Sequence, residues 1–331
     1  MKFNNLPKIE LHCHLDGSVR PDTIIDLAGK NNIELPSKDI EKIKSLMIAP
    51  NDCESLDEYL KRFYLPGLIM QDSASLERIT FELMEDAAKE YVVYIEIRFA
   101  PLLHINKGLS PKVVIESVLR GIKRAEEKYD IKGNLILSCM RTMDVESSYE
   151  VIEAGKEFLG NGVVAIDLCS SENEKFSEKF KEPIALARRY GYRVTIHAGE
   201  TGIGENVLEA IDILKAERIG HGIFIKDCKE AYNIVKKKNI TLEMCPTSNL
   251  QTKAIESIKN YPLVNFYNDN IKVSLNTDNR TVSNTNLSNE YDIILNGFNM
   301  SEIDYKEIYL NSVEASFADT ETKIKLKNYI K

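Results

Sequence analysis

The amino-acid sequence predicts a (β/α)8 barrel, because short apolar runs alternate with helical patterns along its 331 residues. The runs are continuous and rich in Val, Ile and Leu, which is typical of parallel strands buried on both faces. A doubly wound sheet would also alternate, but it usually carries its chemistry near a glycine-rich first turn, and this sequence has none there. The eight runs cover residues 9–15, 92–100, 135–140, 163–168, 194–198, 219–223, 241–245 and 273–276.

Helices are expected between these runs, where apolar residues recur near the helical period. The clearest helical patterns cover residues 74–89, 113–129, 178–190 and 227–238, and two or three further helices are expected from residue 287 onward. Ser110 and Pro111 suit the start of the second helix, and Gly191 suits the end of the third. Nothing in the composition marks a boundary, so residues 1–331 are expected to form a single domain.

The connection after the first run is long, from about residue 17 to residue 90, and holds at least two helical segments. A long connection at the mouth of a barrel is a natural lid. An apolar stripe at helical spacing falls within it, and ordinary core packing is the alternative explanation for each member. The stripe consists of Leu56, Tyr59, Leu60 and Phe63.

Composition excludes several classes of protein. The net charge of −8 argues against a dedicated nucleic-acid or membrane-surface binder. No apolar run reaches transmembrane length, and the first six residues do not resemble a signal peptide. The six cysteines form no CxxC pair, and four of them lie in apolar segments, which favours buried thiols in a reducing compartment. A cytoplasmic protein is therefore expected, and its oligomeric state is left open.

Four of the five histidines fall at the expected strand ends, where barrel enzymes place their active sites. His12 and His14 share one face of the first strand, because residues i and i+2 of a strand point the same way. His197 lies near the end of the fifth run, and His221 lies in the sixth. His104 follows Pro101 in a loop without a clear partner and is interpreted as structural.

A metal site is predicted from these residues and Asp278, which follows the eighth run. The first and eighth strands of a closed barrel are neighbours, so His12, His14, His197 and Asp278 can converge. This donor set suits Zn²⁺ with a water completing the coordination, and zinc lowers the pKa of that water toward neutrality. Binuclear barrels commonly use a modified lysine after the fourth strand. The segment 163–170 has none, which favours one metal.

Two further residues complete a catalytic set. Glu200 lies three residues after His197, a position from which it could act as a proton donor, and His221 could orient the water or take its proton. Taken singly, Glu200 could be a surface-loop residue and Asp278 a helix cap. The combination makes a purely structural explanation improbable.

These stretches resemble the adenosine deaminase family of the metal-dependent amidohydrolase superfamily. The resemblance runs through nearly the whole chain in the same order. It is carried by His-Cys-His-Leu-Asp-Gly at 12–17, Val-Val-Ala-Ile-Asp-Leu at 163–168, His-Ala-Gly-Glu at 197–200, Gly-His-Gly-Ile at 220–223 and Ser-Leu-Asn-Thr-Asp at 274–278.

The resemblance implies hydrolytic deamination of adenosine and 2′-deoxyadenosine to the inosine products and ammonia, within purine salvage. It implies one Zn²⁺ per chain, held by His12, His14, His197 and Asp278. Glu200 would protonate N1 of the purine, and His221 would position the hydroxide that adds to C6. The partner implied is a small-molecule nucleoside.

The resemblance also implies a substrate-binding set of His14, Asp16, Ser170 and Asn279, and two of these depart from the family's usual pattern. Asn279 replaces an aspartate that bonds N7, and an amide can donate there without being protonated. Ser170 replaces a glycine whose backbone N–H reaches N3, and serine must adopt the same backbone conformation to serve. Asp16 favours a ribose-bearing substrate, because relatives that act on the free base tend to carry glutamate.

Alternatives stay open at this point. Within the class they are free adenine, a 5′-modified adenosine and a futalosine-type nucleoside such as aminodeoxyfutalosine. Outside it stands a barrel that binds a nucleoside without turning it over. A nucleotide monophosphate is disfavoured, because Arg280 is the lone basic residue close to these strand ends.

Overall fold

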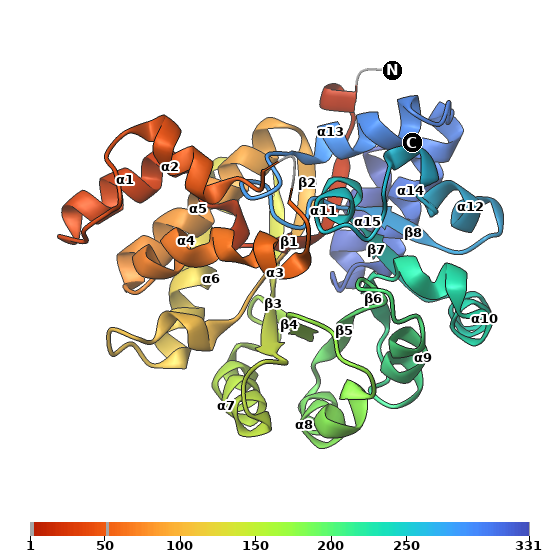
Figure 1. The fold of residues 1–331 in the computed structure, drawn as a ribbon, viewed down its shortest axis with the longest axis horizontal. Helices are drawn as coiled ribbons and strands as arrows, with labels where there is room; N and C mark the ends of the chain where they lie inside the picture. Colours follow the sequence, from red (N-terminus) through yellow and green to blue (C-terminus); the bar gives the residue numbers. More distant parts are fainter. Residues whose placement is uncertain (1–2, 51–52, 331) are drawn as a thin grey trace.

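The computed structural model describes residues 3–50 and 53–330, and in them eight parallel strands follow one another around a barrel in chain order, as predicted (Figure 1). The barrel closes where the first and last strands meet: His14 N donates to Asp278 O at 2.7 Å, and Asp278 N donates to His12 O at 2.9 Å. The strands are β1 (Lys8–His14), β2 (Val92–Phe99), β3 (Lys132–Met140), β4 (Val163–Cys169), β5 (Arg193–Ala198), β6 (Arg218–His221), β7 (Thr241–Met244) and β8 (Val273–Leu275).

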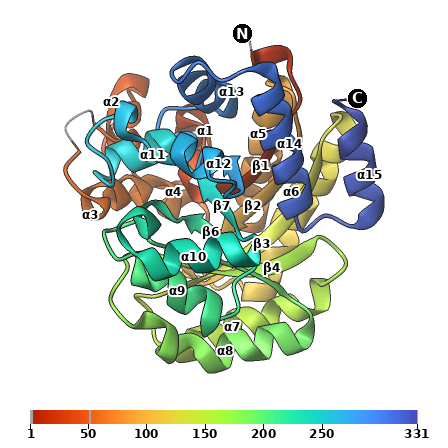
Figure 2. The same cartoon turned by 90° about the vertical axis from the view of Figure 1, so that its right-hand side faces the viewer.

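Helices surround the barrel on its outer face, and the four predicted helical segments are all present (Figures 1 and 2). The Ser110 hydroxyl accepts a hydrogen bond from Val113 N, and Gly191 ends its helix in the left-handed conformation at φ +103°. Both capping predictions are therefore confirmed. The outer helices after β2 to β7 include α6 (Pro111–Lys128), α7 (Val145–Gly155), α8 (Phe176–Tyr190), α9 (Glu205–Asp212), α10 (Lys229–Lys238), α11 (Pro246–Gln251) and α12 (Leu263–Asn268).

The long connection after β1 is helical, as expected, and it covers part of the barrel mouth. Tyr59 anchors it there: this side chain is buried, its hydroxyl lies 2.6 Å from Ser283 Oγ, and it packs with Val282. Both partners follow β8, so the connection is held to the strand that closes the barrel. Its helices are α1 (Pro21–Lys30), α2 (Ile40–Met47), α3 (Leu56–Leu60), α4 (Tyr64–Ile69) and α5 (Ser73–Lys89).

The C-terminal segment also matches the expectation, with α13 (Leu287–Tyr291), α14 (Glu302–Ala315) and α15 (Thr320–Asn328). Figure 2 shows α14 and α15 beside the barrel. Between them, Phe317 packs on Ile136 and Ala165, and its ring lies 3.8 Å from the Arg218 guanidinium. The segment therefore covers strand residues at the end of the barrel opposite the histidines. No helix among the described residues is both long and apolar enough to cross a bilayer.

Candidate active site

A cavity of about 200 Å³ lies at the carboxyl ends of the strands, where the sequence predicts the site. Predicted site residues line it; they come from the ends of β1, β4, β5, β6 and β8 and from the connection after β1. The lining residues are His14, Asp16, Leu56, Tyr59, Leu60, Phe63, Ala100, Leu103, Met140, Cys169, Ser170, His197, Glu200, His221, Asp278 and Asn279. His104 lies outside this lining and stacks on Phe99, which agrees with its structural interpretation.

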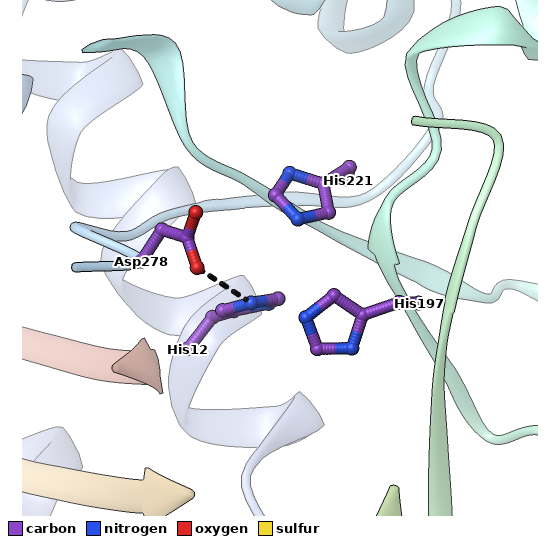
Figure 3. A group of neighbouring side chains, drawn as sticks. All are labelled: His12, His197, His221 and Asp278. Carbon is purple, nitrogen blue, oxygen red and sulfur yellow. Dashed lines mark ion pairs between the residues drawn. The ribbon is translucent and has the colours of Figure 1, made fainter. Parts of the chain in front are cut away.

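The side chains of His12, His197, His221 and Asp278 point toward one another (Figure 3), and the last three also line this cavity. The Oδ1 atom of Asp278 lies 3.3 Å from His12 Nε2 and 3.4 Å from His14 Nε2. The Nε2 atoms of His14 and His197 are 3.2 Å apart. His221 joins the group, since the ligand atoms of His12, His197, His221 and Asp278 all lie within 4.8 Å of one another. The structure therefore brings together all four predicted ligands and the predicted catalytic histidine.

The electrostatics of this cluster suit a metal ion. Burial, together with the nearby Arg98 and His197, lowers the pKa of His12 to about 4, and burial also lowers the pKa of His14 well below its usual value. Both rings are therefore neutral at physiological pH and have a free lone pair. Burial opposes ionisation of Asp278, but its close contacts with the ring nitrogens of His12 and His14 hold the pKa of this carboxyl well below its usual range. The Nε2 atom of His12 is buried without a hydrogen-bond partner, as expected for a ligand atom.

A second layer of polar residues orients these side chains. His12 Nδ1 lies 2.9 Å from Glu243 Oε2, His197 Nδ1 lies 3.0 Å from Asp167 Oδ1, and Ser248 Oγ donates to Asp278 Oδ2 at 2.6 Å. Carboxylates behind ligand histidines fix the ring tautomer and leave Nε2 free to bind a metal. Sequence reasoning missed Glu243, Asp167 and Ser248. The two carboxylates had a detectable signal, because each is a single acidic residue inside an otherwise apolar strand.

Glu243 is also the centre of a buried charge network inside the barrel. Its carboxylate accepts hydrogen bonds from Arg98 at 2.7 Å, Arg218 at 2.6 Å and Thr195 at 2.8 Å. Although burial opposes it, Arg98 and Arg218 hold the pKa of Glu243 well below its usual range. Glu243 therefore bridges two buried guanidinium groups, which Asp167 and Glu96 also pair, and it orients His12.

Glu243→Gln is expected to reduce both stability and metal affinity. Removing one partner from a buried ion pair costs about 3–5 kcal/mol, and loss of an outer partner of a metal ligand costs about 10–100-fold in affinity. Urea denaturation and competition with a metal chelator measure the two effects. Glu217→Gln is the control, because Glu217 pairs with Arg193 on the surface and its loss should change stability by less than about 1 kcal/mol. Equal effects of the two substitutions would contradict this account of Glu243.

Glu200 lies beside this cluster, within the cavity wall. Its Oε2 atom is 3.6 Å from His221 Nε2, and its side chain is buried. Burial raises the pKa of Glu200, and the negative charges of Asp278 and Glu172 add to the rise while His221 opposes it. A buried carboxyl with a raised pKa beside a metal-type cluster is the arrangement of a general acid.

The comparison with known protein families agrees with this geometry. Residues 7–331 match the model of the family described as "Adenosine deaminase". This chain belongs to the adenosine deaminase family. A curated relative named adenosine deaminase, from Clostridium botulinum (strain Okra), is 59% identical over 100% of this chain and 99% of its own length.

Two solved structures are similar in fold to this chain. An adenine deaminase from Arthrobacter aurescens is 26% identical, covers 98% of both chains and has a TM-score of 0.91. An amidohydrolase from Burkholderia ambifaria with bound zinc is 25% identical, covers 99% of this chain and 90% of its own, and has a TM-score of 0.89. The chain is thus an enzyme of the deaminase class with an amidohydrolase-type barrel.

The predicted base-contacting positions of this adenosine deaminase family member line the cavity. Ser170 has φ +80°, so it adopts a left-handed conformation that favours glycine. Asn279 turns its Oδ1 toward Gly17, where an added Cβ would lie only 1.8 Å from that oxygen. Glycine is therefore required at position 17, because any side chain would collide with Asn279.

Asp16 follows β1 in a short 3₁₀ turn (Asp16–Ser18) and lines the cavity. Its Oδ1 atom is buried without a partner, and burial raises its pKa to about 6. An unpaired buried carboxylate oxygen at a cavity wall is a free acceptor for a ligand. Leu56, Tyr59 and Phe63, from the connection after β1, form an apolar wall of the same cavity.

Proposed function

We propose that this chain deaminates adenosine and 2′-deoxyadenosine, with one zinc ion per chain, in purine salvage. The observation that carries the proposal is the placement of Glu200 next to the His/Asp cluster in one cavity lined by apolar lid residues. The relative that is 59% identical over the full chain bears the name of this activity. Acid, metal-type donors and an enclosed apolar wall are the components that hydrolysis of an aminopurine requires.

His12, His14, His197 and Asp278 are the residues that would hold the zinc. Three nitrogens and one carboxylate form a donor set typical of catalytic zinc, and the similar amidohydrolase structure contains zinc. When bound, the ion supplies Lewis acidity that makes water a competent nucleophile at neutral pH. The remaining chemistry depends on side chains of the protein.

Glu200 supplies the proton. As the buried neutral acid it can donate to N1 of the purine, and this protonation makes C6 electrophilic. Burial raises its pKa, which favours the protonated form that can donate. The cavity must bind the tetrahedral centre at C6 more tightly than the flat ring, because only differential binding of the transition state accelerates the reaction.

His221 orients the attacking oxygen, and its hydrogen-bond partner Asn249 determines which ring nitrogen faces that oxygen. Tyr261 donates its hydroxyl proton to Asn249 Oδ1 at 3.0 Å, so the Asn249 amide nitrogen faces His221 Nδ1, also at 3.0 Å. A His221 ring that accepts the Asn249 N–H at Nδ1 carries its ring proton at Nε2, on the side of Glu200. His221 therefore acts by donating a hydrogen bond to the attacking oxygen.

Asp16, Asn279 and Ser170 would hold the nucleoside, together with His14 at the cavity wall. Asp16 offers its unpaired Oδ1 to the ribose 5′-hydroxyl. The Oδ1 of Asn279 is enclosed against Gly17, so the amide nitrogen is the group that can donate to N7. The left-handed backbone of Ser170 supports its use of the backbone N–H toward N3.

The proposal includes a nucleoside rather than a nucleotide substrate. The residues lining the cavity, among those the structure describes, include neither Lys nor Arg. Arg280 is absent from the lining and pairs instead with Glu90. A phosphate group would therefore find no cationic partner at these walls.

The chain would act as one catalytic domain, with α3 and the 3₁₀ turn that follows it (Lys61–Phe63) as a lid whose Leu56, Tyr59 and Phe63 enclose the substrate. All six cysteines are buried and free, which supports a reducing, cytoplasmic location. The net charge of −8 supports a small-molecule substrate in preference to nucleic acid.

A panel of three substrates tests the proposal. The enzyme is expected to convert adenosine at a kcat/KM at least about tenfold above those for adenine and 5′-methylthioadenosine, because Asp16 pairs with a free 5′-hydroxyl. The change in ultraviolet absorbance on deamination gives the rates. The adenine deaminase of similar fold makes free adenine the main competitor. No turnover of adenosine would overturn the proposal, and no turnover of adenine, 5′-methylthioadenosine or aminodeoxyfutalosine either would leave a nucleoside-binding barrel.

A further inference from the structure

Glu172 is a buried carboxylate outside the catalytic set, and three donors converge on it. Its Oε2 accepts from Gly199 N at 2.9 Å and from Asn206 Nδ2 at 2.7 Å, and its Oε1 accepts from Glu200 N at 2.6 Å. The residue is 8% exposed although it follows β4 in a loop that faces the barrel mouth. Charge-assisted hydrogen bonds of this length are among the stronger ones in proteins.

The backbone between β5 and Glu200 is shaped to meet this carboxylate. Gly199 adopts φ +66°, which turns the N–H groups of Gly199 and Glu200 toward the same side. Successive N–H groups arranged in this way form a concave anion site, and the Glu172 side chain fills it. A Cβ on Gly199 would lie 2.7 Å from Val207 Cγ2, so the turn also needs glycine for space.

We propose that Glu172 is a positioning residue that fixes the Gly199–Glu200 turn and thereby aims the Glu200 carboxyl at the substrate. The inference rests on the proposed function, in which Glu200 is the proton donor. Glu172 ties the loop after β4 to the turn after β5 and, through Asn206, to α9. Glu172 therefore holds Glu200 through the backbone N–H of Glu200. The side-chain carboxyl of Glu200 stays available beside His221.

The ionised carboxylate is essential for this role, because a carboxylate is an acceptor at both oxygens. In Glu172→Gln one oxygen becomes an NH₂ group, which would face the N–H of Glu200 or the donors Gly199 N and Asn206 Nδ2. At least one hydrogen bond is lost and one donor meets another donor. The turn then relaxes, although the shape of the side chain is preserved.

Glu172→Gln is expected to lower kcat for adenosine about 10–100-fold, the effect typical of displacing a catalytic group by about 1 Å. The affinity for inosine should stay within about threefold of the wild-type value, since Glu172 lies outside the cavity lining. Amide hydrogen exchange of the segment 198–203 should become faster, and zinc content should be unchanged. The exchange measurement requires no turnover, so it tests the positioning role even if adenosine is not the substrate.

Glu174→Gln is the matched control, because Glu174 is exposed in the same loop and should leave kcat and exchange unchanged. A kcat for Glu172→Gln within about twofold of wild type, or an inosine affinity that falls as far as kcat, would overturn the inference. If Glu172→Gln does not fold, Asn206→Ala removes one donor and keeps the carboxylate. This variant should lower kcat a few-fold and speed up exchange, and no change in either would likewise refute the role of Glu172.

Discussion

Glu200→Gln is expected to lower kcat for adenosine by about 10³–10⁴-fold, because general acid catalysis at a single group contributes up to about this factor. The amide has nearly the same shape as the acid and cannot transfer a proton to N1. Inosine affinity and zinc content should remain near wild-type values, since Glu200 is not one of the proposed ligands. Stopped-flow or steady-state absorbance with adenosine measures the loss.

Glu205→Gln is the control for this experiment, because Glu205 is exposed in the first turn of α9. It should leave kcat within about twofold of wild type, as is usual for a surface substitution. Full turnover by Glu200→Gln would show that another group protonates the purine. The 3.6 Å contact of Glu200 with His221 would then be structural.

Removal of the proposed zinc ion is expected to abolish turnover, and one equivalent of zinc per chain should restore it. Four donors converge in the cluster, and two of their rings are held neutral by burial, so the site is prepared for a cation. Metal analysis after dialysis against a chelator, followed by titration with zinc, gives the stoichiometry. Because the ion binds the folded chain, it should also raise the free energy of unfolding, by about 3–4 kcal/mol when free zinc is 100–1,000 times Kd.

Asp278→Asn isolates the contribution of the carboxylate to this site. Asparagine tolerates the φ of +60° at position 278, so the closure of β8 on β1 should persist while the charge is lost. Zinc affinity and turnover should both fall sharply. Asp22→Asn on the exposed face of α1 is the control and should change neither. Turnover by enzyme that holds less than about a tenth of an equivalent of metal would contradict a role for the ion.

The sequence alone predicted the order of the strands, because barrel strands are buried on both faces and stand out as apolar runs. Their ends were less well determined. β3 begins at Lys132, three residues before the expected 135, because Lys132, Gly133 and Asn134 pair with β2 and are not apolar. β1 ends at His14 instead of 15, since the chain turns into the 3₁₀ segment at Asp16.

The histidines and Asp278 were predictable because polar residues at strand ends converge in any closed barrel. Only the tertiary structure decided which histidine each carboxylate of the second layer orients. Glu243 and Asp167 are far in sequence from His12 and His197, and no local pattern links them. The hydrogen bonds of Glu172 likewise join residues about 30 positions apart. Spacing along a chain reveals which side chains share a strand face, whereas contacts across the barrel depend on strand register, which only the folded chain sets.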